Sequence, residues 1–196
     1  MGTHMLIPLD GSELAEAALA YAESIGKALG WHAVLFSVVE PDTSQPPYLP
    51  STPVIEAPAP AWRAWAEHEA ERGEAVRDEE TAAFDAMSGA ARRLEAAGLQ
   101  VVREVGVGHP RDVIVRRAGA DDISMIVMAS HGRTGLARLF RGSVAAAVAD
   151  HAPRATLLVR PFRDAGHRVD LEHADKLPAD QAEAVRRAVA ATSPPT

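Results

Sequence analysis

Short, almost wholly apolar segments alternate along this chain with segments whose apolar residues recur at helical spacing. The apolar segments predict strands at residues 5–9, 33–39, 99–107, 125–128 and 155–160. The segments with helical spacing predict helices at residues 14–29, 75–97, 110–118 and 144–151. Such alternation is typical of parallel strands joined by right-handed crossovers. We therefore expect an α/β fold, a five-stranded parallel sheet flanked by helices on both faces.

Two stretches lie outside this minimal fold. Pro41 to Pro60 is rich in proline and predicts an exposed, irregular excursion, the first part of an insertion at about 41–74. A helical pattern then runs to Ala97, and a continuous helix there would be roughly 55 Å long. Because a five-residue strand covers only about 17 Å, we expect a break near Gly73. The packing helix that follows should turn four side chains inward: Phe84, Met87, Ala91 and Leu94.

The ends of the chain are interpreted separately from the domain at 5–161. Residues 1–4 resemble a cloning remnant and are set aside. Residues 162–196 form a polar C-terminal extension with a weak apolar stripe that predicts one helix. The stripe consists of Leu177, Ala182, Val185 and Val189.

Composition limits the classes of function. The 196 residues are 47% apolar, which favours one globular domain with appendages. A formal net charge of -7 argues against a general nucleic-acid binder, which needs a broad basic face. Zero cysteines exclude disulfides and thiol catalysis. Because no apolar run approaches the roughly 18 residues that span a bilayer, we expect no membrane association and cytoplasmic residence.

The clearest sign of a ligand is the stretch from Met128 to Val144. A short apolar strand runs into a turn of small residues, and Gly142-Ser143 then opens an apolar helix. Small residues let the backbone come close to a ligand, and the first N–H groups of a helix bind anions. The loop contains no acidic residue and three arginines: Arg133, Arg138 and Arg141. We therefore expect an anionic ligand.

Three segments could meet at one edge of the predicted sheet, because ligands bind outside the carboxyl ends of parallel strands. The carboxylate of Asp10, after the first strand, suits a ribose hydroxyl. Backbone groups at Val38, at the end of the second strand, suit an adenine edge. The loop after Met128 suits phosphates. Together they predict a nucleotide laid across the edge of the sheet.

Four segments resemble the nucleotide-binding branch of the universal stress protein family: Leu6–Ser12, Leu35–Pro41, Val105–Pro110 and Met128–Val144. The resemblance covers about residues 5–161 and implies a Rossmann-like fold similar to the adenine nucleotide alpha hydrolases. The family's binding pattern is G-x2-G-x9-G-[ST]. Gly132, Gly142 and Ser143 match it, whereas Ala129 replaces the first glycine. Alanine costs little at ordinary dihedrals and much more at positive φ, and the strand-to-turn position favours ordinary dihedrals.

The resemblance implies a site for ATP, with Mg²⁺ bound through the phosphates and no metal ligand from a protein side chain. The implied ATP-binding residues are Pro8, Asp10, Val38, Met128, Ala129, Ser130, His131, Gly132, Arg133, Thr134, Gly142, Ser143 and Val144. It also implies a homodimer through the last strand, Ala155 to Arg160. An apolar face and an edge position would suit that strand to pairing with its copy.

Alternative functions remain open at this point. The leading hypothesis is an ATP-binding regulatory or stress-response module, with AMP or a cyclic nucleotide as other adenine ligands. A slow ATPase or phosphotransferase is the second, although the pattern G-x4-G-K-[ST] is absent and no catalytic residue is predicted. The third is a nucleotide-free interaction module. In that case Ala129 blocks the pocket, and the proline-rich segment or the extension recruits a partner.

Overall fold

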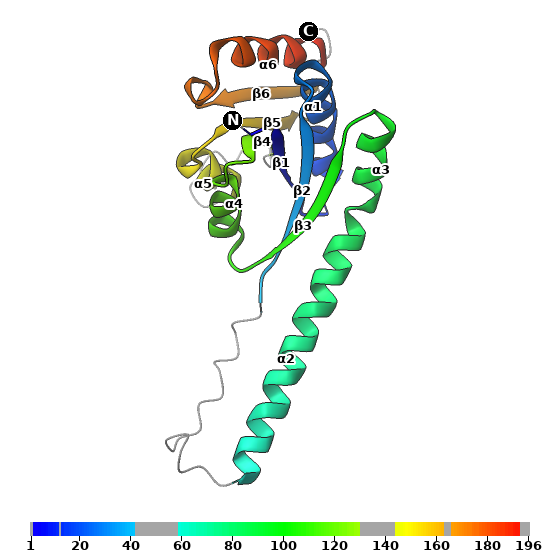
Figure 1. Ribbon diagram of the computed structural model, residues 1–196, viewed down its shortest axis with the longest axis vertical. Helices are drawn as coiled ribbons and strands as arrows, with labels where there is room; N and C mark the ends of the chain where they lie inside the picture. The colour runs from blue at the N-terminus through cyan, green and yellow to red at the C-terminus, as the bar shows by residue number, and fades with distance from the viewer. Residues whose placement is uncertain (1, 12, 42–58, 130–143, 163–165, 193–196) are drawn as a thin grey trace.

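The computed structural model describes residues 2–11, 13–41, 59–129, 144–162 and 166–192. Most of the predicted excursion at 41–60 therefore lies outside the described residues. The described elements are β1 (His4–Pro8), α1 (Glu13–Leu29), β2 (His32–Val39), α2 (Ala59–Ala86), α3 (Ser88–Ala96), β3 (Val101–Val107), α4 (Pro110–Ala118), β4 (Ile123–Ala129), α5 (Val144–His151), β5 (Ala155–Phe162), β6 (Gly166–Glu172), η2 (Ala174–Lys176) and α6 (Ala179–Thr192) (Figure 1).

The strands form one sheet with the order β3-β2-β1-β4-β5-β6. The first five are parallel, with Met5 opposite Ala33 on β2 and Met125 on β4. The predicted α/β fold is thus confirmed, with one addition: β6 runs antiparallel to β5. The chain moves outward from β1 through β2 to β3 and then crosses to β4 on the other side of β1. Strand order therefore reverses between β1 and β4.

Side chains alternate between the two faces of the sheet, and each face has its own core. We call the face covered by α1, α3 and α6 the α1 face and the face covered by α4 and α5 the α4 face. The buried core on the α1 face includes Met5, Ile7, Leu35, Met125 and Leu157 from the strands and Tyr21, Ile25, Leu94 and Val185 from the helices. The core on the α4 face includes Leu6, Val34, Ile126, Leu158, Ile114 and Val148.

The expected helix break near Gly73 is wrong. The helix α2 continues through Gly73 as far as Ala86, and α3 begins at Ser88. A glycine inside a helix costs only about 1 kcal/mol relative to alanine, so it does not by itself end one. At about 1.5 Å per residue, α2 spans about 42 Å. Its N-terminal part consequently extends well beyond the sheet (Figure 1).

Arg103 on β3 explains why the break falls at Met87. Its guanidinium lies 4.0 Å from the centre of the Phe84 ring, and Nη1 donates hydrogen bonds to the Phe84 carbonyl (3.1 Å) and Ser88 Oγ (2.7 Å). The Phe84 carbonyl is thus bound by β3 at the junction between α2 and α3. Met87 is buried as expected, as are Ala91 and Leu94, but Phe84 is 38% exposed beneath the guanidinium.

The C-terminal extension is more structured than its sequence suggests. The expected helix is present as α6, in which Ala182 and Val185 are buried and Val189 packs against the same core. The strand β6 has no counterpart among the predicted elements. Because β6 pairs with β5, the expectation that residues 155–160 lie at the edge of the sheet is wrong.

Candidate functional site

The carboxyl ends of β1, β2 and β4 lie side by side at the point where strand order reverses. Pro8 is opposite Phe36, and the N–H of Leu9 donates a 2.8 Å hydrogen bond to the Phe36 carbonyl. This bond keeps the chain after β1 against β2 and places Asp10, which is exposed, just beyond the edge of the sheet. In α/β folds, ligands bind beside the carboxyl ends of parallel strands at such a switch point.

Three of the predicted site residues share the α4 face. Met128 is buried in the core of that face, and half-buried Val38 and Val144 pack against it. Val144 is the first residue of α5, so the N-terminal end of this helix lies on the same side of the sheet as Val38 and Met128. Three predicted site residues from β2, β4 and α5 are therefore on one face of the sheet.

The alanine that replaces the family's first glycine causes no backbone strain. Ala129 is the last residue of β4, and the only described non-glycine residue with positive φ is His173. The expected ordinary dihedrals are thus confirmed. Half-buried Ala129 packs against the core on the α1 face. Its methyl group is consequently directed away from the face that carries Val38, Met128 and Val144.

A close backbone approach beside Val38 was missed in the sequence interpretation. Gly106 on β3 pairs with Val38, and a Cβ atom at Gly106 would lie 2.5 Å from Val113 Cγ1 and 2.8 Å from Phe36 Cζ. Gly108 has a φ of 132° and donates its N–H to the Val39 carbonyl at 2.9 Å. The Gly-Val-Gly segment of the sequence was the available signal for both.

The remaining predicted residues cannot be placed relative to this edge. Ser130, His131, Gly132, Arg133, Thr134, Gly142 and Ser143 lie outside the described residues. The structure thus places six predicted residues at the carboxyl ends of β1, β2 and β4 or on the sheet faces beside them. They are Pro8, Asp10, Val38, Met128, Ala129 and Val144. In the part of the chain that the structure describes, no three His, Asp or Glu side chains cluster closely enough to hold a metal ion.

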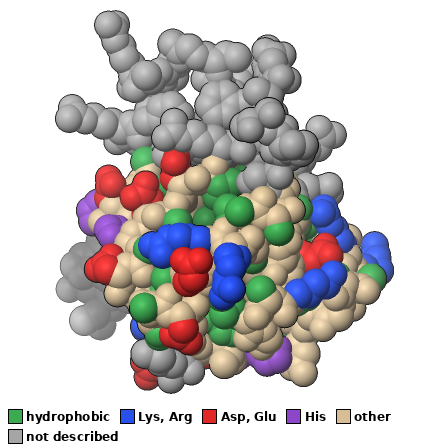
Figure 2. Space-filling model, turned by 90° about the horizontal axis from the view of Figure 1, so that it is seen from above, with side chains coloured by type: hydrophobic (Ala, Val, Ile, Leu, Met, Phe, Trp, Pro, Cys, Tyr) green, Lys and Arg blue, Asp and Glu red, His purple; other side chains and the backbone are tan. Residues whose placement is uncertain are grey.

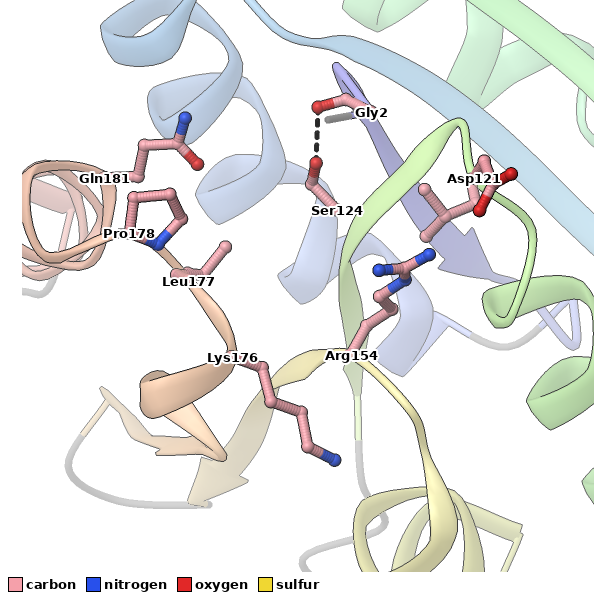
Figure 3. A pocket seen from close by; sticks show the side chains of 9 residues that line it. Gly2, Asp121, Ser124, Arg154, Lys176, Leu177, Pro178 and Gln181 are labelled. Carbon is pink, nitrogen blue, oxygen red and sulfur yellow. Dashed lines mark hydrogen bonds between the residues drawn. The ribbon is translucent and has the colours of Figure 1, made fainter.

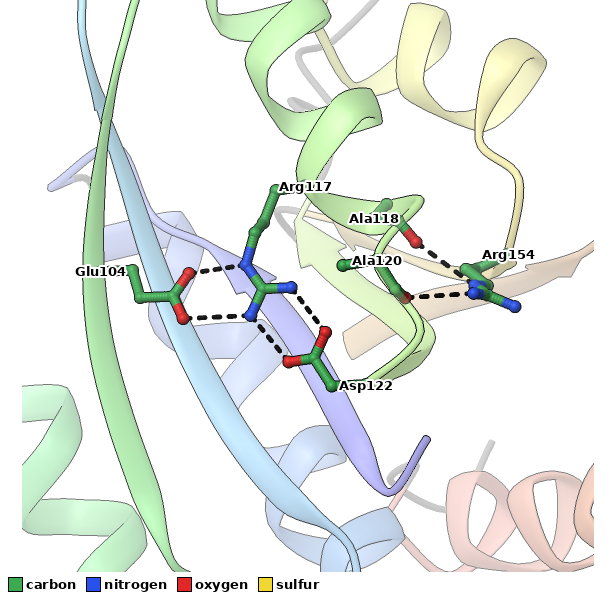
Figure 4. Close-up of polar contacts among 6 residues, drawn as sticks. All are labelled: Glu104, Arg117, Ala118, Ala120, Asp122 and Arg154. Carbon is green, nitrogen blue, oxygen red and sulfur yellow. Dashed lines mark hydrogen bonds and ion pairs between the residues drawn. The ribbon is translucent and has the colours of Figure 1, made fainter. Parts of the chain in front are cut away.

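A separate cluster of charges fastens α4 to the sheet. Arg117 donates hydrogen bonds to both carboxylate oxygens of Glu104 (2.6 and 3.0 Å) and of Asp122 (2.9 and 2.8 Å) (Figure 4). These bonds lower the pKa of Asp122 below its ordinary value and raise that of Arg117, for which Glu104 is the larger cause. Arg154 binds the carbonyls of Ala118 and Ala120 at the end of α4. Asp122 precedes β4, so the cluster lies toward the opposite end of the strands from the candidate site.

The described surface gives two further observations. In the view from above Figure 1, basic side chains are interspersed with acidic ones, unlike the single-sign face of a nucleic-acid binder (Figure 2). Of the helices within the described ranges, none combines the length and apolar character that crossing a bilayer requires.

Comparisons with known proteins agree with this architecture. The pattern of the universal stress protein family matches residues 1–160. Universal stress protein MJ0577 of Methanocaldococcus jannaschii is 27% identical over 156 residues, which cover 80% of this chain and 93% of that protein. Its solved structure has a TM-score of 0.59 at 24% identity and covers 84% of this chain and 99% of that one. A universal stress protein in complex with cAMP has a TM-score of 0.50 at 21% identity, covering 80% and 94%.

The strand order and the flanking helices define an α/β protein whose strand order reverses between β1 and β4. The match over residues 1–160 then identifies the lineage: this chain belongs to the universal stress protein family. The resemblance of the four sequence segments to the universal stress protein family is thus confirmed. The elements β6, η2 and α6 lie beyond the matched residues.

Proposed function

We propose that this protein binds ATP at the carboxyl ends of β1, β2 and β4 and acts as a regulatory stress-response module. The observation that carries the proposal is the meeting of these strand ends where strand order reverses, with α5 starting on the α4 face. The carboxylate of Asp10 accepts hydrogen bonds from the ribose hydroxyls, and backbone groups at Val38 bind the adenine edge. The solved universal stress protein in complex with cAMP supports an adenine ligand in this fold.

The phosphates of ATP are assigned to the loop and to the start of α5. Gly132, Gly142 and Ser143 match the family pattern, and α5 begins at the next residue, Val144. Backbone N–H groups at a helix N-terminus are suited to phosphate. Mg²⁺ would be bound by phosphate oxygens. Because the sequence from Met128 to Val144 contains no lysine, we assign it binding with little or slow hydrolysis.

The geometry at Ala129 favours this proposal over a nucleotide-free module. A blocked pocket would require the methyl group to enter the crevice on the α4 face. Ala129 instead packs against the core on the α1 face and has no positive φ. Ala129→Gly should therefore change ATP affinity little, because the methyl group lies on the α1 face and position 129 does not require positive φ.

Thermal unfolding with and without ATP and Mg²⁺ tests the proposal. A ligand that binds only the folded protein raises Tm, and the stabilisation grows with the logarithm of its concentration relative to Kd. Asp10→Asn should weaken ATP binding by about tenfold, because a charge-assisted hydrogen bond contributes roughly 1.5–3 kcal/mol. Asp121→Asn is the matched control: it removes the same charge from an exposed position before β4, toward the other end of the strands.

The outcomes separate the alternatives. A Tm that does not change with ATP rejects the proposal and favours the nucleotide-free module. An equal loss of affinity in the Asp10 and Asp121 variants would reject the ribose assignment alone. A parallel titration with AMP and cAMP identifies the preferred adenine ligand, and phosphate release tests for a slow ATPase. Cytoplasmic residence, the remaining part of the proposal, is tested by cell fractionation.

A further inference from the structure

The strand β6 covers the outer edge of β5 along nearly its whole length, from Thr156 to Phe162. Seven residue pairs join the two strands, from Thr156 opposite Glu172 to Phe162 opposite Gly166. All of β6 lies beyond the family match, which ends at residue 160. The family domain of this chain would therefore end in an uncovered strand if the extension were absent. Uncovered, apolar edge strands are sites at which another chain pairs.

The helix α6 covers a second part of the same surface. Val185 is fully buried in the core on the α1 face, with Ala182 and Ala188 beside it. At the end of α6, Thr192 Oγ1 donates a 2.6 Å hydrogen bond to Ser24 Oγ on α1. The extension thus shields the flank of α1 as well as the β5 edge.

Two polar contacts fasten the connection between β6 and α6. His173 Nε2 lies 2.8 Å from the Ala149 carbonyl, and Lys176 Nζ donates a 2.6 Å hydrogen bond to the Ala152 carbonyl. Both carbonyls belong to the end of α5, where cations and donors are favourable. A pocket of about 360 Å³ remains along this boundary, lined by Arg154 and Ser124 of the domain and by Pro178 and Gln181 of the extension (Figure 3).

The register between β5 and β6 indicates which other strand could pair with the edge of β5. On the α1 face, β6 places Leu171 opposite Leu157 and Val169 opposite Val159. An antiparallel copy of β5, centred on Leu158, would place Leu157 of one copy opposite Val159 of the other on that face. The edge is therefore self-complementary, as a twofold interface requires. A second β5 supplies the same kind of apolar pairs that β6 supplies.

We propose that residues 166–192 cover the edge of β5, through which two copies of this chain would otherwise dimerise. With β6 and α6 in place, the chain does not dimerise through β5. When the extension is released, two copies pair through their β5 strands. The expected homodimer through Ala155 to Arg160 is thereby replaced by a monomer whose dimer interface is covered by its own C-terminal extension.

The absence of cysteine from the sequence allows a reversible test in the full-length chain. Thr156→Cys with Glu172→Cys places two thiols at paired positions of adjacent antiparallel strands, a separation that suits a disulfide. Oxidation then holds β6 on β5, and reduction frees it. Val185→Asp, which puts a carboxylate in a fully buried position, is added to release the extension. Ala190→Asp, at an exposed position of α6, makes the same charge change and is the control.

Native mass spectrometry and sedimentation velocity measure the outcome. The wild type and the Ala190 variant should be monomers. The Val185 variant with both cysteines should double its mass when reduced and return to the monomer when oxidised. A reduced variant that stays monomeric, or an oxidised one that dimerises equally, overturns the proposal.

If Val185→Asp abolishes cooperative melting, Val185→Ala replaces it. A partial, concentration-dependent dimer is then expected, and a monomer at every concentration contradicts the proposal.

Discussion

Gly106→Ala should destabilise the protein through a collision that two buried side chains cannot escape. The added Cβ would lie 2.5 Å from Val113 Cγ1 and 2.8 Å from Phe36 Cζ, whereas carbon atoms normally approach to about 3.5–4.0 Å. Val113 and Phe36 are each only 4% exposed, so neither can turn into solvent. Because Gly106 does not have positive φ, the backbone itself accepts alanine, and the effect is one of packing.

The expected cost is that of overpacking a core, about 1–3 kcal/mol. For a chain of this length that corresponds to a fall in Tm of roughly 2–12 °C. Thermal and urea unfolding measure it. Gly89→Ala in α3 is the control, because its added Cβ has no neighbour within 4 Å. It should leave stability unchanged or raise it by up to about 1 kcal/mol.

A double-mutant cycle locates the collision. Val113→Ala removes the atom nearest to the added Cβ, and alone it should cost about 1–3 kcal/mol. Combined with Gly106→Ala, it should cost less than the sum of the single variants, with a coupling free energy of about 1 kcal/mol or more. Additive effects, or a Gly106 variant as stable as the Gly89 variant, would show that the added methyl group does not collide with Val113. Since Val38 pairs with Gly106, the single variant should also weaken ATP binding.

Two further predictions concern the packing and charges of the described residues. Leu94→Ala should lower the free energy of unfolding by about 2–5 kcal/mol, because Leu94 is completely buried, and urea unfolding would contradict this with a loss below 1 kcal/mol. Arg117→Met should cost about 1–2 kcal/mol at pH 7, because it leaves the partly exposed Glu104 and Asp122 carboxylates without their donor. The pKa of Asp122 is lowered in the folded state, so its contribution is present above the unfolded pKa and lost as pH falls through the folded one. The difference between wild type and Arg117→Met should therefore shrink below about pH 4, and a difference that is constant from pH 7 to pH 3 would contradict this assignment.

The strands β1, β2, β4 and β5 could be predicted because each of them is apolar on both faces of the sheet. Alternating residues of β4, such as Ile126 and Val127, are buried on opposite faces, which makes the segment conspicuous in the sequence. The strand β6 could not be recognised in this way. It is a polar segment in which Val169 and Leu171 alone carry the apolar pairing with β5, and only the tertiary contact with β5 makes it a strand.

The position of the helix break and part of the candidate site also depend on tertiary contacts that the local sequence does not reveal. The end of α2 depends on Arg103, which is distant in sequence from Phe84, so local propensity at Gly73 gave the wrong position. The placement of Asp10, Val38 and Met128 could be predicted, because the carboxyl ends of parallel strands share one edge. The direction of the Ala129 methyl group could not, since it depends on which face of the sheet each residue of β4 meets.

Crystals of the protein grown with ATP and Mg²⁺ would show whether the nucleotide occupies the strand ends. We expect nucleotide density across the carboxyl ends of β1, β2 and β4, with the ribose at Asp10, the adenine against the backbone of Val38 and the phosphates at the start of α5. Density elsewhere on the molecule, or an empty strand-end crevice at saturating ATP, would contradict it.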